Sequence, residues 1–145
     1  KDVSGRLELV RIFSNNIKVY VDFAHTPDAL KKTLKALRDL YGDNISIVFG
    51  CGGDRDFKKR PMMAKIVNSY CKKIYITDDN PRNENPHRIR QTILKYINDK
   101  LVELKEKLNS SGDFYGQTGY SIKEIDARLS DSSKQYEFKT VALVI

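Results

Sequence analysis

Short apolar runs alternate with amphipathic stretches along most of the chain, and this alternation constrains the fold more than any other feature. The apolar runs lie at residues 17–23, 45–49 and 73–77. The stretches between them repeat apolar residues every three or four positions, which is typical of helices packed on one side. Strands that alternate with helices of this length predict βαβ units and a mainly parallel α/β sheet.

The N-terminal part of the chain predicts a further element, in which the run at 17–23 takes part. Residues 7–13 and 17–23 both alternate apolar and polar side chains, and the polar triplet Ser14-Asn15-Asn16 separates them. Alternating runs with a short polar connection predict an antiparallel hairpin, which adds an antiparallel strand to the sheet.

Three stretches predict helices. The first begins at Thr26-Pro27, where Thr26 can cap the early amides, and it ends near Gly42. The second begins at Pro61, and the third begins at Asn85-Pro86 and extends to about residue 108. The expected buried faces are Leu30, Leu34, Leu37 and Tyr41, then Met62, Ile66, Val67 and Tyr70, then Ile89, Ile93, Ile97, Leu101, Leu104 and Leu108. Beyond these, residues 122–129 predict a short helix and 140–145 a buried strand.

Length and composition bound the class of protein. A chain of 145 residues fits one domain, 1–145, and the missing initiator Met predicts a fragment or a processed product. No signal peptide is visible, and no apolar run approaches the roughly 18 residues of a membrane span. Cys51 and Cys71 lack metal-binding spacing, so we expect structural thiols in a reducing cytoplasm and no metal site.

The chain is basic, with 26 Lys and Arg against 19 Asp and Glu, which gives a net charge of +7. A basic surface suits a polyanion, either nucleic acid or a nucleotide or phosphorylated metabolite. A solvated surface without any partner is the commonest outcome for such a charge. The basic residues are scattered, with one cluster at Arg55, Lys58, Lys59 and Arg60.

Polar residues follow the three predicted parallel strands directly, at 22–26, 50–60 and 78–82. In open α/β sheets ligands bind beyond the carboxyl ends of the strands. We therefore expect these three loops to meet in one site.

The loop after residue 49 combines Gly50, Gly52 and Gly53 with Arg55 and flanking carboxylates. Glycines let backbone amides approach a ligand, but a tight turn with a surface ion pair explains the pattern equally well. The Walker pattern GxxxxGK[ST] is absent from the whole chain, so no triphosphate site of that kind is predicted.

The segment Asp79-Asn80-Pro81-Arg82 joins an acceptor, an amide, a rigid turn and a planar guanidinium. The guanidinium fits a carboxylate bidentately, and Asp and Asn suit an ammonium and a carboxylate, so the set fits an amino acid. On composition alone, an Asx-type turn before a helix is favoured over this site.

Asp22 and His25 place a carboxylate and an imidazole just before a helix N-terminus, an edge that suits a nucleotide. The alternative is a structural histidine bonded to backbone, which is slightly favoured for His25 alone.

Together these segments resemble the C-terminal domain of the Mur ligases, the ATP-dependent enzymes that build the peptidoglycan stem peptide. The closest resemblance is to the members that add meso-diaminopimelate to UDP-N-acetylmuramoyl-L-alanyl-D-glutamate. The matching segments are 5–8, 21–30, 49–56 with 59–63, and 77–82, in the order of the family. Four linked motifs at the right spacing are specific, and they imply a Rossmann-like, mostly parallel α/β fold with an antiparallel hairpin and flanking helices.

The resemblance implies roles for individual residues. Arg55 and the four residues Asp79, Asn80, Pro81 and Arg82 match positions that bind diaminopimelate, with Arg82 on its distal carboxylate. Arg6, Asp22 and His25 match positions that face ATP.

The resemblance also implies a larger enzyme. A central domain outside this chain would hold ATP and Mg²⁺, other domains would hold the UDP precursor, and an acyl phosphate would form before the amine attacks. We expect no catalytic residue in this fragment and no activity of the fragment alone. We also expect a bacterial cytoplasmic location, with no nucleic-acid or membrane partner.

The chain departs from the family in its last third. Residues 109–145 match poorly, and the Gly-Lys-Gly-His-Glu loop that contributes to amino-acid binding is missing from the chain. The amino-acid clamp is therefore expected to be incomplete here. Two alternatives stay open: a related ligase that adds lysine or another diamino acid, and a stand-alone basic module that binds nucleic acid.

Overall fold

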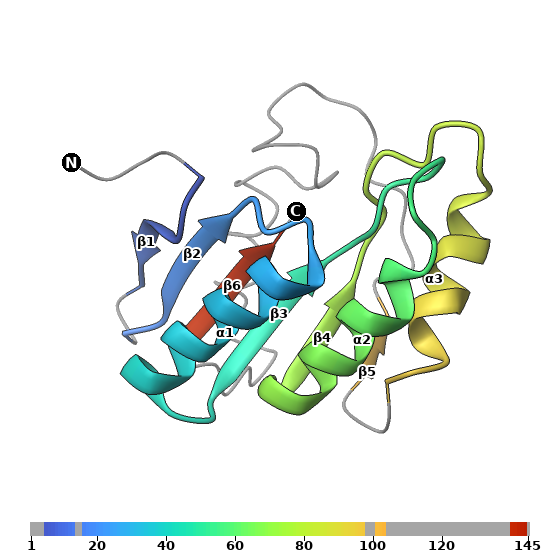
Figure 1. Cartoon of the computed structure of the whole chain (residues 1–145). Coiled ribbons are helices and arrows are strands. Elements are labelled where there is room, and N and C mark those ends of the chain that lie inside the picture. Colours follow the sequence, from blue (N-terminus) through green and yellow to red (C-terminus); the bar gives the residue numbers. More distant parts are fainter. Residues whose placement is uncertain (1–4, 14–15, 98–100, 104–139, 145) are drawn as a thin grey trace.

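The computed structural model describes residues 5–13, 16–97, 101–103 and 140–144 (Figure 1). They form one mixed sheet in the order β1-β2-β6-β3-β4-β5. The strands are β1 (Glu8–Ile12), β2 (Lys18–Asp22), β3 (Ile45–Phe49), β4 (Lys73–Ile76), β5 (Leu101–Glu103) and β6 (Thr140–Val144). The helices are α1 (Pro27–Tyr41), α2 (Lys59–Tyr70) and α3 (Pro86–Leu94). The predicted α/β class is confirmed.

The pairing of the strands is parallel from β2 to β5 and antiparallel only between β1 and β2. The predicted hairpin is therefore confirmed, and it forms one edge of the sheet. The predicted terminal strand is also confirmed as a strand. It lies between β2 and β3, where Val141 pairs with Val19 on one side and Ser46 on the other.

The helices form a layer on one face of the sheet, with α1 beside α2 and α3 next to α2 (Figure 1). Each step from β2 through β3 and β4 to β5 moves in the same direction across the sheet. Parallel crossovers are right-handed almost without exception, so successive steps in one direction place their helices on the same face.

Helix α1 shows how the local sequence fixes an element. The Thr26 hydroxyl accepts a bond from the Ala29 amide at 3.3 Å, and Gly42 ends the helix with φ +72°. Leu30, Leu34 and Leu37 are fully buried, as the apolar stripe predicted. Burial of each leucine contributes about 2 kcal/mol. The core continues through β3, where all five residues are buried.

Helix α2 differs from its prediction. It begins at Lys59 instead of Pro61, and the buried residues are Arg60, Met63, Ala64 and Val67. Met62, expected in the core, is 53% exposed. The buried residues follow the spacing i, i+3, i+4, i+7 from Arg60, whose side chain is bonded to Glu84, and Met62 lies off this face.

Helix α3 is shorter than predicted. It ends at Leu94, and the prediction of one helix to residue 108 is wrong because Leu101 belongs to β5. Leu101 pairs with Ile74 on the edge of β4, so strand pairing wins over helical spacing there. Leu104, Leu108 and the helix predicted at 122–129 lie outside the described residues. Among the described helices, none is long and apolar enough to cross a membrane.

Candidate functional site

The three polar loops meet in one pocket at the carboxyl ends of the strands, as the sequence predicts. The pocket has a volume of about 840 Å³. Its lining comes from the loop after β2, the loop after β3, the loop after β4 and the start of α2. The lining residues are Phe23, His25, Gly50, Cys51, Gly52, Arg55, Asp56, Lys59, Arg60, Met63, Asp79 and Arg82.

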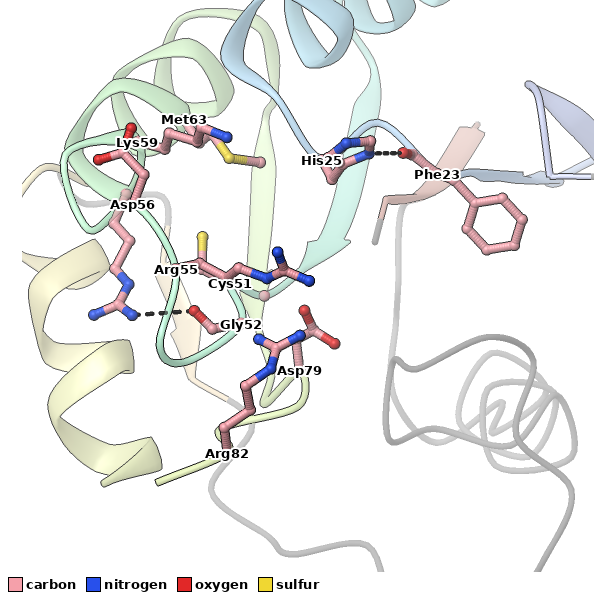
Figure 2. Close-up of a pocket in the computed structure, with 12 residues that line it drawn as sticks. Phe23, His25, Cys51, Gly52, Arg55, Asp56, Lys59, Met63, Asp79 and Arg82 are labelled. Carbon is pink, nitrogen blue, oxygen red and sulfur yellow. Dashed lines mark hydrogen bonds between the residues drawn. The ribbon is translucent and has the colours of Figure 1, made fainter. Parts of the chain in front are cut away.

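Charged groups from two loops gather around Gly52. Figure 2 shows Arg55 and Arg82 pointing toward the region of Asp79. A Cβ atom placed on Gly52 would lie 3.1 Å from Arg82 Nη1 and 3.3 Å from Asp79 Oδ2. Gly52 therefore leaves room for a cation and an anion to lie side by side at the pocket wall.

The two arginines keep donors available. Arg82 Nη1 donates to the carbonyl oxygen of Gly53 at 2.5 Å. Arg55 is exposed and makes no hydrogen bond or ion pair with any other residue that the structure describes. The surface Arg–Asp pair that was the alternative for this loop is therefore not formed among the described residues. A guanidinium carries five donors in a planar fork, so both side chains can still bind a carboxylate.

Asp79 carries an unsatisfied acceptor. Its Oδ1 atom is buried and has no hydrogen-bond partner among the described residues. A buried carboxylate oxygen without a donor is unfavourable by roughly 1–3 kcal/mol or more. A positively charged donor, such as the ammonium of a ligand, would satisfy it.

Asn80 and Pro81 form the turn that presents Arg82. Asn80 Oδ1 accepts the Arg82 amide at 3.1 Å, and the Pro81 carbonyl accepts the Glu84 amide at 2.9 Å. Arg82 itself has φ +47°, a left-handed conformation. The Asx-type turn favoured by composition is thus present, and Asn80 and Pro81 lie outside the pocket lining, whereas Asp79 and Arg82 belong to it.

The side of the pocket near β2 uses its polar groups differently. The exposed His25 ring lines the pocket, and its Nδ1 lies 3.0 Å from the Phe23 carbonyl oxygen (Figure 2). Because that oxygen can only accept, Nδ1 carries a proton in this bond, and Nε2 has no hydrogen-bond partner among the described residues. The backbone-bonded histidine that was the alternative is therefore observed, and it still leaves one ring nitrogen for a ligand.

Asp22 and Arg6 do not line the pocket. Asp22 is 6% exposed, and its Oδ2 accepts the Leu7 amide at 2.8 Å. The carboxylate therefore fixes the segment next to the exposed Arg6. Of the three residues matched to the nucleotide side, the structure brings only His25 to the pocket.

Arg60 and Glu84 form an ion pair beside the pocket that sequence analysis missed. The basic cluster at 55–60 divides in the structure, because Arg60 is buried and donates to both carboxylate oxygens of Glu84, at 2.7 and 2.9 Å. These hydrogen bonds, with one from the Asp54 amide, lower the pKa of Glu84 to about 2. The two residues are far apart in sequence, and no spacing pattern predicts their pairing.

Cys51 forms part of the apolar wall of the pocket. Burial raises the pKa of its thiol to about 12, the nearby Asp79 acts in the same direction, and Arg60 opposes it. The thiol is therefore neutral at physiological pH. Neither Cys51 nor Cys71 forms a disulfide, so both keep their thiols. Across the described ranges, no group of three or more His, Cys, Asp or Glu side chains is arranged to hold a metal ion.

The fold is an α/β domain with a pocket beyond the carboxyl ends of a parallel sheet, the place where such domains commonly bind ligands. Residues 5–113 match the family model described as Mur ligase, glutamate ligase domain. The chain belongs to this family.

Named relatives agree with the family. The UDP-N-acetylmuramoyl-L-alanyl-D-glutamate–2,6-diaminopimelate ligase of Vibrio parahaemolyticus serotype O3:K6 is 51% identical over 137 residues, 94% of this chain and 28% of that protein. The ligase of the same name from Chelativorans sp. is 46% identical over 97 residues, 67% of this chain and 20% of that protein. This chain thus spans about a quarter of their length or less.

Solved structures show the same fold. A ligase of that name superposes with a TM-score of 0.69 and 28% identity, over 98% of this chain and 26% of that one. The folylpolyglutamate synthase of Mycobacterium tuberculosis superposes with a TM-score of 0.62 over 99% of this chain and 29% of that one. Its identity of 16% shows the shared fold alone.

Proposed function

We propose that residues 1–145 form the amino-acid-binding C-terminal domain of an ATP-dependent ligase that adds meso-diaminopimelate to UDP-N-acetylmuramoyl-L-alanyl-D-glutamate. The names of the relatives support this substrate. The observation that carries the proposal is the pocket wall at Gly52, where the unsatisfied Asp79 carboxylate lies close to Arg82.

The groups in this wall fit the chemistry of an amino acid. An ammonium group would donate to the buried Oδ1 of Asp79, and the guanidinium groups of Arg55 and Arg82 would hold carboxylates. Asn80 and Pro81 would act through the turn that presents Arg82, since Asn80 Oδ1 accepts the Arg82 amide.

Two cationic forks favour diaminopimelate over lysine. Diaminopimelate has a carboxylate and an ammonium at each end, whereas the side-chain end of lysine has only the ammonium. With lysine, Arg82 would lose the distal carboxylate, so the lysine complex would have one charge-assisted contact fewer.

In the proposed reaction, the terminal carboxylate of the precursor takes the γ-phosphoryl group of ATP, which gives an acyl phosphate and ADP. The free amine of diaminopimelate then attacks the acyl carbon, phosphate leaves, and the amine loses a proton. This domain would supply the position of the amine, by holding the other polar groups of the amino acid.

Nucleotide contacts form a smaller part of the proposal. His25 would face ATP through Nε2, and Asp22 would act by holding the segment that carries Arg6. ATP and Mg²⁺ would be bound mainly by a domain outside this chain. We therefore expect the isolated chain to be inactive. Because ATP and a UDP-linked precursor are cytoplasmic metabolites, the enzyme would act in the bacterial cytoplasm.

Product mass tests the proposal. The complete protein that carries this chain would be incubated with ATP, the UDP-linked dipeptide and an equimolar mixture of diaminopimelate and lysine. The proposal expects the diaminopimelate product to dominate. A predominant lysine product would support the related ligase, and no product with either amino acid would reject both.

A further inference from the structure

The ion pair between Arg60 and Glu84 joins the two loops that form the pocket wall at Gly52. These are the loop after β3, residues 50–58, called the glycine loop below, and the loop after β4, residues 77–85. Only 6% of the Arg60 side chain is exposed, against 33% for Glu84. Besides its two bonds to Glu84, the guanidinium donates to the carbonyl oxygen of Gly52 at 3.0 Å. One buried cation thus holds the glycine loop and the loop after β4 at the same time.

Backbone bonds extend this junction. Glu84 Oε1 also accepts the Asp54 amide at 2.7 Å, and the Gly53 amide donates to the Asn80 carbonyl at 2.9 Å. Asn83 adds two bonds to Asp54 Oδ2, at 2.9 and 3.1 Å. The two loops are therefore linked by several hydrogen bonds next to Gly53, whose carbonyl oxygen accepts from Arg82.

The junction contains two left-handed residues that are not glycine. Asp54 has φ +50° and Arg82 has φ +47°. Such conformations are unfavourable and persist where the surrounding contacts over-determine them. For Asp54 these contacts include the bond from its amide to Glu84, and for Arg82 they include the bonds to Asn80 and Gly53.

The Glu84 carboxylate is paired with Arg60 and not with Arg82. Glu84 bonds to Arg60 with both oxygens, while the Arg82 side chain is bonded to a backbone carbonyl. Glu84 lies two residues after Arg82 in the sequence. If its carboxylate were released from Arg60, it would compete with a ligand carboxylate for the Arg82 guanidinium.

From this arrangement we propose that Arg60 and Glu84 are positioning residues for the amino-acid substrate. The pair fixes the turn at 79–82 against the glycine loop, and it keeps Arg82 free for a substrate carboxylate. The inference rests on the proposed function, since it assumes that this pocket receives the amino acid.

The test is a set of steady-state measurements on the complete ligase with Glu84→Gln and Arg60→Lys. Glutamine keeps the size and the acceptor for the Asp54 amide but removes the charge, and lysine keeps the charge but loses the planar fork. We expect the KM for diaminopimelate to rise roughly 10- to 100-fold in both variants, with the KM values for ATP and the UDP precursor unchanged.

The matched control is Asp43→Asn, which breaks the exposed ion pair with Arg38, whose atoms lie 2.7 Å apart. This pair lies at the opposite edge of the sheet, with Arg38 in the last turn of α1 and Asp43 shortly before β3. It should leave all three KM values unchanged. Thermal unfolding of each variant checks that it is folded, and Arg60→Lys carries the test if Glu84→Gln does not fold.

An unchanged KM for diaminopimelate in a folded variant overturns the inference. So does a fall in kcat alone, or an equal rise of all three KM values, because each indicates a general structural role. If the unaltered enzyme makes no diaminopimelate product, the proposed function fails first, which separates the two outcomes.

Discussion

The two sides of the pocket use charged side chains in opposite ways. Beside β2, the Asp22 carboxylate is buried and bonded to the backbone of Leu7, so its charge serves the fold. Beside β3 and β4, Arg55 is exposed without a partner among the described residues, and Asp79 keeps a buried oxygen that is unsatisfied there. Both sides follow the carboxyl ends of strands, so position alone does not identify a ligand-binding residue. The hydrogen bonds that each side chain already makes separate a residue that supports the fold from one with groups available to a ligand.

The largest expected effect comes from removing Arg82, the arginine that we propose holds a substrate carboxylate. Arg82→Ala in the complete ligase should lower kcat/KM for diaminopimelate by about 2–5 kcal/mol, or about 30-fold to several thousand-fold, because a bidentate charged contact is lost. Arg88→Ala on the exposed side of α3 is the control and should have little effect. Equal kcat/KM values for Arg82→Ala and Arg88→Ala would contradict a special role of the charged groups beside β3 and β4.

The next effect concerns the junction behind the arginines. A Cβ atom on Gly53 would lie 1.8 Å from the Pro81 carbonyl oxygen, so Gly53→Ala must separate the two loops. We expect a loss of about 3 kcal/mol in the free energy of unfolding, measured by urea denaturation. Gly42→Ala meets no atom within 4 Å and should lose only about 1 kcal/mol from its left-handed backbone. A smaller loss at Gly53 than at Gly42 would contradict the close packing of the loops.

A third prediction concerns the β2 side. Asp22→Ala leaves the Leu7 amide without its partner, which should lower the free energy of unfolding by about 1–3 kcal/mol. The KM for diaminopimelate should be unchanged, because Asp22 does not line the pocket. A selective rise of that KM, without loss of stability, would show that the carboxylate serves the ligand after all.

The smallest effect is a pH dependence. The Arg60 hydrogen bonds hold the pKa of Glu84 at about 2, below its usual value of 4.5. The stabilisation by Glu84 is therefore complete above about pH 4.5 and is lost as the pH falls toward 2. The difference in unfolding temperature between the unaltered chain and Glu84→Gln should shrink over that range. A difference that stays constant from pH 5 to 2 would contradict the charge pairing.

Local signals made much of the fold predictable. The capped helix at Thr26, the hairpin and the buried strands depend on nearby residues. The convergence of three loops at one sheet edge follows from the parallel α/β class, because parallel strands share one carboxyl edge. Leu101 was misassigned because its spacing fits a helix, while its pairing partner Ile74 is distant in sequence. The buried face of α2 differs from the prediction for a similar reason, since it includes the charged Arg60, whose partner Glu84 is distant in sequence.

The candidate site was predictable in outline and less so in detail. The resemblance of four motifs pointed to Arg55, Asp79 and Arg82, and these residues line one pocket. The sequence could not distinguish Asp22, whose carboxylate is used by the backbone, from Asp79, whose oxygen is unsatisfied among the described residues. Both are aspartates after a strand, and only the tertiary contacts separate them.

The central claim is that the arginine side of the pocket holds the distal carboxylate of diaminopimelate. Calorimetric titration of the complete ligase, saturated with the UDP precursor and a non-hydrolysable ATP analogue, tests it most directly. The account predicts that diaminopimelate binds at least about 30-fold more tightly than lysine, and that Arg82→Ala abolishes this difference. Equal affinity for the two amino acids in the unaltered enzyme, or a preference that survives Arg82→Ala, would contradict it.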